Sequence, residues 1–209
     1  MSLFSIGNKK QIMNRVFKSH PQIRGEKSSR QSIHCVDQVI TIFNSLFLNS
    51  YNTRLSGGGD EPIYRPASTV GQCHEIIFTN DYFASALHEV AHWCVAGEQR
   101  RMKTDYGYWY APDGRSDSQQ KMFEKVEVRP QALEWVFSRA ANFRFRLSSD
   151  NLDAKAEASQ AFKLNVYEQV IDYCEQGFPQ RAQIFAAKLK QQFGGADFEN
   201  KTNYQIEKL

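Results

Sequence analysis

The sequence predicts an α+β (mixed α/β) fold in which a small, mainly antiparallel sheet packs against about five helices. Two observations support this class: stretches with helical apolar spacing alternate with short strand-like stretches, and turn residues separate them. A chain of 209 residues, 41% of them hydrophobic, can bury one good core. We therefore expect a single domain over residues 31–195, between a basic N-terminal extension (1–30) and a mobile C-terminal tail (196–209).

The first half of the chain favours one helix followed by short strands. Apolar residues recur at helical spacing from about residue 32 to 47. Strand-like pieces follow at 52–55, 62–65 and 75–79, and a flexible glycine-rich run, 56–59, separates the first two. A further strand is expected at 106–110, ended by the turn Pro112-Asp113-Gly114.

The second half favours helices with clear start and stop signals. Ser116 or Asp117 can cap a helix that Pro130 interrupts, after which a second segment reaches about residue 142. Two more helices fit residues 156–176, ended by Gly177, and 181–193, ended by Gly194 and the next glycine.

The motif His88-Glu89-Val90-Ala91-His92 is the most informative stretch of the chain. It lies in an apolar run from residue 82 to 95 that predicts a buried helix, for which Thr79, Asn80 or Asp81 could be the N-cap. On a helix, His88 and His92 lie on one face about one turn apart, so both can bind a single divalent metal. Two core histidines flanking a chance glutamate are the alternative, but a buried helix favours the metal site.

An open metal site needs a third protein ligand, and the downstream helix offers carboxylates. Glu127 and Glu134 lie at the border of its core face, two turns apart, whereas Glu124 turns toward solvent. Glu127 lies between two valines, so we expect it to be the buried acid and the third ligand. His34 and His74 are possible ligands that nothing in their context favours.

Two imidazoles and one carboxylate with open coordination positions suit zinc in peptidases and ferrous iron in oxygenases. The residues alone leave both possibilities open. In a peptidase, Glu89 would be the general base that activates metal-bound water. In an oxygenase, Glu89 would instead lie next to the metal ligands without acting as a base.

Charge and composition indicate a protein without membrane or direct nucleic-acid partners. The net charge of +3 is too small to indicate nucleic-acid binding, and no apolar run approaches a membrane span. The four scattered cysteines favour reduced thiols in the cytoplasm. Residues 1–30 carry seven basic residues and one acid, which favours a flexible extension, with an arm that contacts RNA or an acidic partner as the alternative.

Several ordered segments between about residues 33 and 190 together resemble the bacterial elongation factor P hydroxylase family. These segments are 52–55, 60–64, 85–94, 106–110, 112–115, 126–133 and 150–152. The resemblance implies a fold similar to small metal-dependent hydrolases and hydroxylation of a lysine of elongation factor P after that lysine has received a β-lysyl group. It also implies His88, His92 and Glu127 as ligands of a divalent metal, with Fe(II) and dioxygen as the expected cofactors and the co-reductant unknown.

The aromatic stretch at 106–110 offers a physical basis for recognising a lysyl-lysine arm. Ammonium groups favour aromatic faces and carboxylates, which Tyr106, Tyr108, Tyr110 and Asp113 could supply. Side chains of this stretch that pack into the core are the alternative. The leading hypothesis is therefore a cytoplasmic iron-dependent protein-lysine hydroxylase. A zinc metallopeptidase with His/His/Glu ligands and a metal-stabilised module that binds a ribosome-associated factor are the other two.

Overall fold

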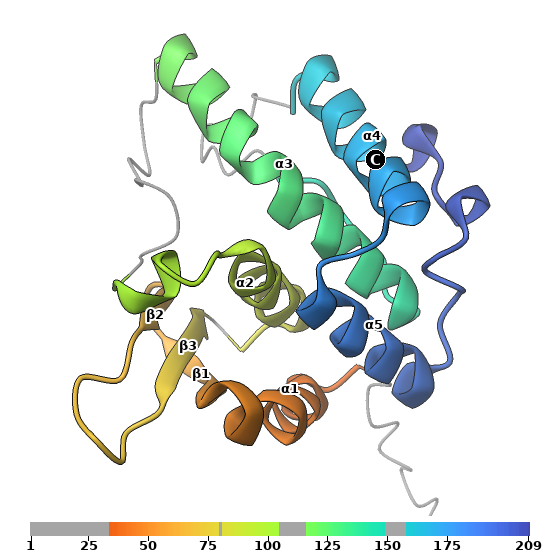
Figure 1. Ribbon diagram of the computed structural model, residues 1–209. Helices are drawn as coiled ribbons and strands as arrows, with labels where there is room; N and C mark the ends of the chain where they lie inside the picture. Colours follow the sequence, from red (N-terminus) through yellow and green to blue (C-terminus); the bar gives the residue numbers. More distant parts are fainter. Residues whose placement is uncertain (1–33, 80, 105–115, 149–157) are drawn as a thin grey trace, which may run out of the picture. The chain divides into compact units, whose positions relative to one another are not determined.

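The computed structural model describes residues 34–79, 81–104, 116–148 and 158–209 (Figure 1). In these residues the helices are α1 (Val36–Tyr51), α2 (Phe83–Val95), α3 (Asp117–Ala140), α4 (Gln160–Gln176) and α5 (Gln180–Phe193). The strands are β1 (Thr53–Gly59), β2 (Ile63–Arg65) and β3 (His74–Thr79), and three short 3-10 helices, η1 (Arg100–Met102), η2 (Lys201–Asn203) and η3 (Ile206–Lys208), complete the set. The α+β class is confirmed. The strand expected at 106–110 lies outside the described residues.

The sheet is mixed, with strand order β1-β3-β2. Its longest pairing, β1 with β3, is parallel from Thr53 opposite His74, whereas the short strand β2 is antiparallel to β3. The expectation of a mainly antiparallel sheet is therefore wrong for β1. Strand propensity locates the strands, but the direction of pairing depends on β2 occupying one edge of β3 and leaving the other edge to β1.

The glycine-rich run belongs to β1 and is not a flexible linker. A Cβ atom added to Gly57 would collide with the Oδ1 atom of Asp81 and lie 3.0 Å from the Phe78 ring. The strand can approach its neighbours this closely only because the side chain is absent. On the other side of β1, the side-chain amide of Asn44 in α1 bonds both the N–H and the C=O of Leu55, at 2.7 and 3.2 Å.

Helix α2 lies at the centre of the domain, in contact with α1, α3, α5, β1 and β3 (Figure 1). Seven of its residues are buried, which explains why the run from residue 82 to 95 is apolar on most sides. The N-cap is Tyr82, and no side chain caps the helix. The predicted N-caps are therefore wrong: Asp81 takes a left-handed turn (φ 50°) just before the helix begins.

Helix α3 runs without a break through Pro130, so the predicted interruption is wrong. Proline has no N–H, which removes the helical partner of the Val126 carbonyl. Val126 is 38% exposed, so this carbonyl need not be desolvated, and the helix tolerates the proline. The predicted start is correct: Ser116 and Gln119 form a capping box.

The C-terminal part packs on the helices. Gly177 and Gly194 end α4 and α5 as predicted. Beyond them, Phe198 and Tyr204 are buried in the core, and the Tyr204 hydroxyl donates to the Phe198 carbonyl at 2.7 Å. The expectation of a mobile C-terminal tail does not hold for these two residues, because two spaced aromatics bury enough apolar surface to fix the segment.

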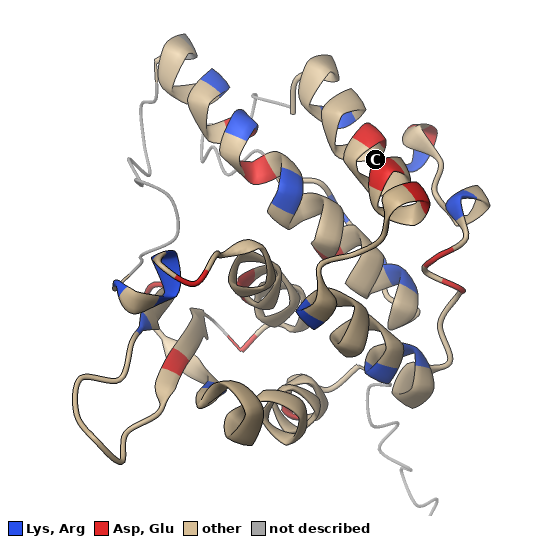
Figure 2. Cartoon of the chain, in the orientation of Figure 1, with Lys and Arg blue, Asp and Glu red and all other residues tan. Residues whose placement is uncertain are grey.

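Charged side chains mark the outer faces of the helices. Figure 2 shows acidic residues along α4, where Glu168, Asp172 and Glu175 recur at helical spacing, whereas α1 carries only Asp37.

In the described residues, no helix is both long and apolar enough to cross a bilayer. Cys94 of α2 is buried with a free thiol, as its place in the apolar helix predicts.

Candidate metal centre

Helix α2 presents His88 and His92 from one face, as the four-residue spacing predicts. Their Nε2 atoms lie 3.0 Å apart and the rings meet edge to face. Both side chains are about one-quarter exposed, so solvent or a ligand can reach them. Two imidazole nitrogens that face each other need a proton or a cation between them.

Glu127 of α3 completes a group of three around these nitrogens. Its Oε1 atom lies 3.3 Å from Nε2 of His92, and its Oε2 atom lies 3.7 Å from Nε2 of His88. One ligand atom from each of the three residues falls within 4.8 Å of the others. Glu127 is 2% exposed, and a carboxylate this buried needs positive partners. Two imidazoles and a buried carboxylate are a donor set that suits a divalent metal.

Glu134, one of the alternative ligands, faces the other nitrogen of His88. The Nδ1–H of His88 donates to Oε2 of Glu134 at 2.8 Å, and Glu134 is itself buried. This bond keeps the proton on Nδ1 and leaves Nε2 free to bind a metal. Glu124 points elsewhere and accepts a 2.7 Å hydrogen bond from the Ser159 hydroxyl at the start of α4. The geometry therefore separates the three glutamates that the sequence left as candidates.

Gln131, one helical turn after Glu127, holds this carboxylate in place. Its side-chain amide lies 3.5 Å from Oε2 of Glu127 and bonds both backbone groups of Ser148, at 2.7 and 3.0 Å. Sequence reasoning overlooked Gln131. Its i+4 spacing from Glu127 was the available signal, but a glutamine on a helix is usually solvated, and only its 1% exposure shows otherwise.

Burial and charge shift the pKa values of these groups. Burial opposes the charged form of His88, but the hydrogen bond to Glu134 and the surrounding carboxylates outweigh it and raise the pKa to about 10. Burial also works against ionised Glu127, yet the two imidazoles and Gln131 prevail and lower its pKa to about 2. In the absence of a metal, these pKa values therefore favour protonated His88 together with ionised Glu127.

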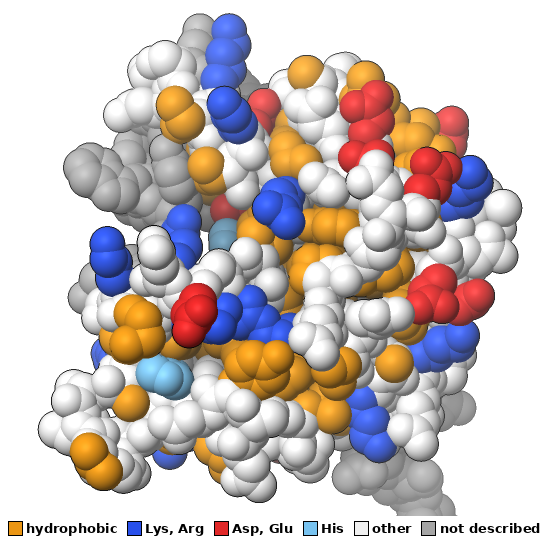
Figure 3. Space-filling model, in the orientation of Figure 1, with side chains coloured by type: hydrophobic (Ala, Val, Ile, Leu, Met, Phe, Trp, Pro, Cys, Tyr) orange, Lys and Arg blue, Asp and Glu red, His pale blue; other side chains and the backbone are white. Residues whose placement is uncertain are grey.

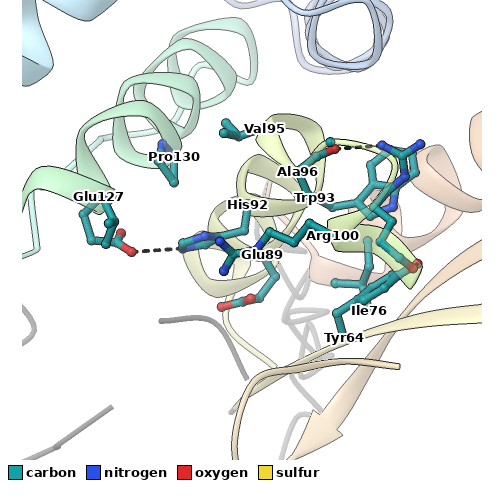
Figure 4. A pocket seen from close by; sticks show the side chains of 13 residues that line it. Tyr64, Ile76, Glu89, His92, Trp93, Val95, Ala96, Arg100, Glu127 and Pro130 are labelled. Atoms are coloured by element: carbon teal, nitrogen blue, oxygen red, sulfur yellow. Dashed lines mark hydrogen bonds and ion pairs between the residues drawn. The ribbon is translucent and has the colours of Figure 1, made fainter. Parts of the chain in front are cut away.

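A cavity of about 170 Å³ opens beside His92 and Glu127 (Figure 4). Glu89 lines it from α2, so all three polar residues of the motif border the centre or its cavity. Burial raises the pKa of Glu89, which the nearby imidazoles oppose. The opposite wall comes from α3, where Val126 and Pro130 provide apolar surface.

The structure brings together His88, His92, Glu127 and Glu89 of the predicted site residues. The predicted substrate-binding residues Tyr106, Tyr108, Tyr110 and Asp113 lie outside the described residues. His74, a possible ligand in the sequence, is not part of the group of His88, His92 and Glu127. Its Nδ1 atom accepts a hydrogen bond from the backbone N–H of Ala67 at 2.8 Å. Other cavity residues that sequence reasoning overlooked come from β2, η1 and the end of α2; they are Tyr64, Trp93, Arg100 and Arg101.

Comparisons with known proteins identify the family of this chain. The family model described as elongation factor P hydroxylase matches residues 42–203, which include both histidines, Glu127 and Glu134. A curated protein of Haemophilus influenzae named elongation factor P lysine hydroxylase is 48% identical over 173 residues. The alignment covers 83% of this chain and 97% of that protein.

Proposed function

We propose that this chain, which belongs to the elongation factor P hydroxylase family, hydroxylates a lysine side chain of elongation factor P. The observation that carries this proposal is the convergence of His88, His92 and Glu127 beside a cavity, in the part of the chain that matches the family. The finer substrate is the lysine that already carries a β-lysyl group.

Three residues are proposed to hold the metal: His88 and His92 through their Nε2 atoms, and Glu127 through its carboxylate. Their separations are consistent with a cation among them. Ferrous iron is the metal we favour, because two histidines and one carboxylate leave coordination positions open, and such iron supplies the chemistry that activates dioxygen.

Glu134 and Gln131 act through the ligands. Glu134 accepts a hydrogen bond from the Nδ1–H group of His88 and so fixes both the tautomer and the plane of the ring. Gln131 positions Glu127 and is itself held by the backbone of Ser148. Both are buried on α3, a single continuous helix, so the third ligand and its supports move as one rigid element.

Glu89 is proposed to face the substrate. Its side chain lines the cavity next to His92, where a carboxylate can accept hydrogen bonds from an ammonium group of the lysyl-lysine arm. The apolar wall of Val126 and Pro130 can pack against the methylene stem of that arm. Selectivity then depends on position, because only one C–H bond can lie next to the metal.

Peptide mass spectrometry of elongation factor P tests the proposal. The modified lysine should carry one additional oxygen atom in cells that have this gene, lose it in the knockout, and regain it with the wild-type gene. The His88→Ala gene should fail to restore it, whereas His34→Ala, which changes a histidine outside the centre, should restore it if the protein accumulates. Persistence of the oxygen in the knockout would exclude this function.

A further inference from the structure

We propose that the cavity contains an anion subsite, formed by Arg101 and Arg100, that binds the carboxylate of a small organic acid acting as co-substrate. This inference rests on the proposed hydroxylase function and adds the chemical class of a second ligand. The cavity joins the two features: His92 and Glu127 line it together with both arginines.

Arg101 is a half-buried cation without an acidic partner among the described residues. Its Nη1 group donates to the Ala96 carbonyl at 2.7 Å, and its backbone carbonyl accepts from the Tyr64 hydroxyl at 2.9 Å. These bonds fix the residue against the end of α2 and the sheet. The one side-chain bond uses one of five guanidinium N–H donors, and the others lie at the edges of the guanidinium plane, where carboxylates bind in pairs.

A second half-buried cation, Arg181, increases the positive charge at the end of α2. Arg181 of α5 donates to the same Ala96 carbonyl at 2.6 Å and to the Cys94 carbonyl at 3.1 Å, and it stacks on Trp93. Its Nη1 atom is buried and has no hydrogen-bond partner among the described residues. Burial and the charge of Arg101 both lower the pKa of Arg181, as expected for two cations that repel each other.

The carbonyl end of α2 offsets part of this charge. Helix C-termini attract cations, and both arginines bond carbonyls there. A helix end carries only about half an elementary charge, however, and two guanidinium groups meet at this one. Arg100 lines the same cavity and, in Figure 4, extends toward His92 and Glu89. The face shown in Figure 3 likewise has Lys and Arg side chains where α2 ends and η1 begins.

The charge of the cavity does not suit the lysyl-lysine arm alone. The charges of a bound divalent metal and of the Arg101 guanidinium together outweigh those of the two glutamates that line the cavity, Glu89 and Glu127. An ammonium group is repelled from the arginine end, whereas a carboxylate is attracted to it. The two ends therefore favour different ligands, with the amine at Glu89 and the anion at Arg101.

Hydroxylation by dioxygen needs a two-electron reductant for electron balance, and a small organic acid can be that reductant. One oxygen atom enters the C–H bond, and the other requires two electrons. A 2-oxo acid supplies them: it takes up the second oxygen atom, breaks its C1–C2 bond, and leaves as carbon dioxide and a carboxylate one carbon shorter. Its carboxylate groups are opposite in charge to a guanidinium group and can accept paired N–H···O bonds from one.

Calorimetric titration of the full chain, loaded with redox-inactive Zn²⁺ under nitrogen, tests the subsite without turnover. We expect 2-oxoglutarate to bind saturably, and Arg101→Gln to weaken binding about 10- to 100-fold, the loss expected for one charge-assisted hydrogen-bonded pair. Arg101→Lys keeps the charge and should retain part of the affinity. Arg144→Gln removes the same charge from an exposed residue outside the cavity and should change nothing.

Inorganic phosphate and lysinamide are the comparison ligands, and both should bind more weakly than 2-oxoglutarate. Equal binding of phosphate would show a nonspecific anion site and overturn the proposal. So would the absence of saturable 2-oxoglutarate binding, or binding that neither Arg101→Gln nor Arg100→Gln weakens. If 2-oxoglutarate does not bind but Arg101→Gln weakens binding of elongation factor P, the carboxylate comes from the protein substrate and the co-substrate assignment is wrong.

These outcomes are separable from those of the proposed function. If elongation factor P carries the additional oxygen atom through this gene but no small acid binds, only the subsite proposal is wrong. If 2-oxoglutarate binds through Arg101 while the knockout leaves elongation factor P unchanged, the subsite stands and the protein substrate is another one.

Discussion

Histidines occur in opposite surroundings beside the first turn of α2 and further along this helix. At its start, His34 packs among the rings of Phe83, Phe143 and Phe193 and bonds the Ala141 carbonyl at 2.8 Å. One turn and more along the helix, Nε2 of His88 faces Nε2 of His92 at 3.0 Å. The first surroundings satisfy the histidine within the fold, whereas the second bring together two ring nitrogens that need a proton or a cation between them.

The difference separates polar groups that are satisfied within the fold, such as His34, from polar groups that can bind a ligand, such as His88 and His92. The Ala141 carbonyl accepts a hydrogen bond from the Nε2–H group of His34, so this ring nitrogen is satisfied within the fold. Two facing imidazoles and the carboxylate of Glu127 form a cluster that a divalent cation satisfies better than a shared proton. Burial does not make this distinction, because all three histidines are partly buried.

The largest expected effect breaks this contrast directly. His88→Ala or His92→Ala should abolish stoichiometric metal binding, because two remaining protein ligands hold a divalent ion weakly. His34→Ala should keep full metal content and lower the free energy of unfolding by about 1–3 kcal/mol, through loss of ring packing and the carbonyl bond. Elemental analysis and chemical denaturation of the purified variants measure both quantities. Loss of metal in His34→Ala with the fold intact would contradict the contrast.

The second expected effect concerns the two buried glutamates of α3. Glu127→Ala should remove metal almost completely, whereas Glu134→Ala should weaken metal affinity about 10- to 100-fold, as removal of a partner of a ligand histidine does. Glu124→Ala is the matched control on the same helix, since Glu124 bonds Ser159 and should leave metal affinity unchanged. Competition titrations with a metal chelator give the affinities. Full retention of metal by Glu127→Ala, with loss in Glu134→Ala, would mean that Glu134 is the metal ligand and Glu127 only its support.

The third expected effect separates hydroxylase from peptidase. Glu89→Gln keeps the shape of the side chain but removes its basicity, so a general-base hydrolase should lose about 10²- to 10⁴-fold in rate. A hydroxylase should lose much less, mainly through weaker binding of the ammonium group. Turnover with elongation factor P and cleavage of a generic peptide are compared for both proteins. Metal-dependent peptide cleavage by the wild type, lost in Glu89→Gln, would favour the zinc peptidase.

The sequence predicts the helices and strands well because each has a local signal. The four-residue spacing of His88 and His92, the capping serine at 116 and the glycines that end α4 and α5 all act within one turn of chain. The errors have other causes. Pairing of β1 with β3 and packing of Phe198 depend on contacts between segments distant in sequence. Continuity of α3 through Pro130 depends on the exposure of Val126, which residue types alone do not give.

The candidate site shows the same division. The proposed ligand pair on α2 follows from spacing alone, and the choice of Glu127 as the proposed third ligand follows from its apolar neighbours. The roles of Glu134 and Gln131 could not be assigned, because helical angle places Glu127 and Glu134 on one face but does not say which of them reaches Nε2 of His88. Arg101 was unrecognisable, since its significance comes from Arg181, eighty residues further along the chain, bonding the same carbonyl.

The smallest expected effect extends the comparison to the two parts of the chain. The described residues begin at residue 34, and the family match begins only at residue 42. Every residue of the proposed centre and cavity lies within the family match. Removal of residues 1–30 should therefore leave the thermal unfolding midpoint, the metal content and the turnover of elongation factor P nearly unchanged.

The control for this deletion is the full chain purified and metal-loaded in the same way, assayed at low and high salt. Seven basic residues in the first thirty could attract an acidic partner, and such attraction weakens as salt rises. If the deletion lowers turnover only at low salt, with metal content unchanged, the basic stretch assists docking of the substrate and is not dispensable. If it lowers metal content as well, the extension contributes to the fold of the catalytic unit, and the division of the chain proposed from its composition is wrong.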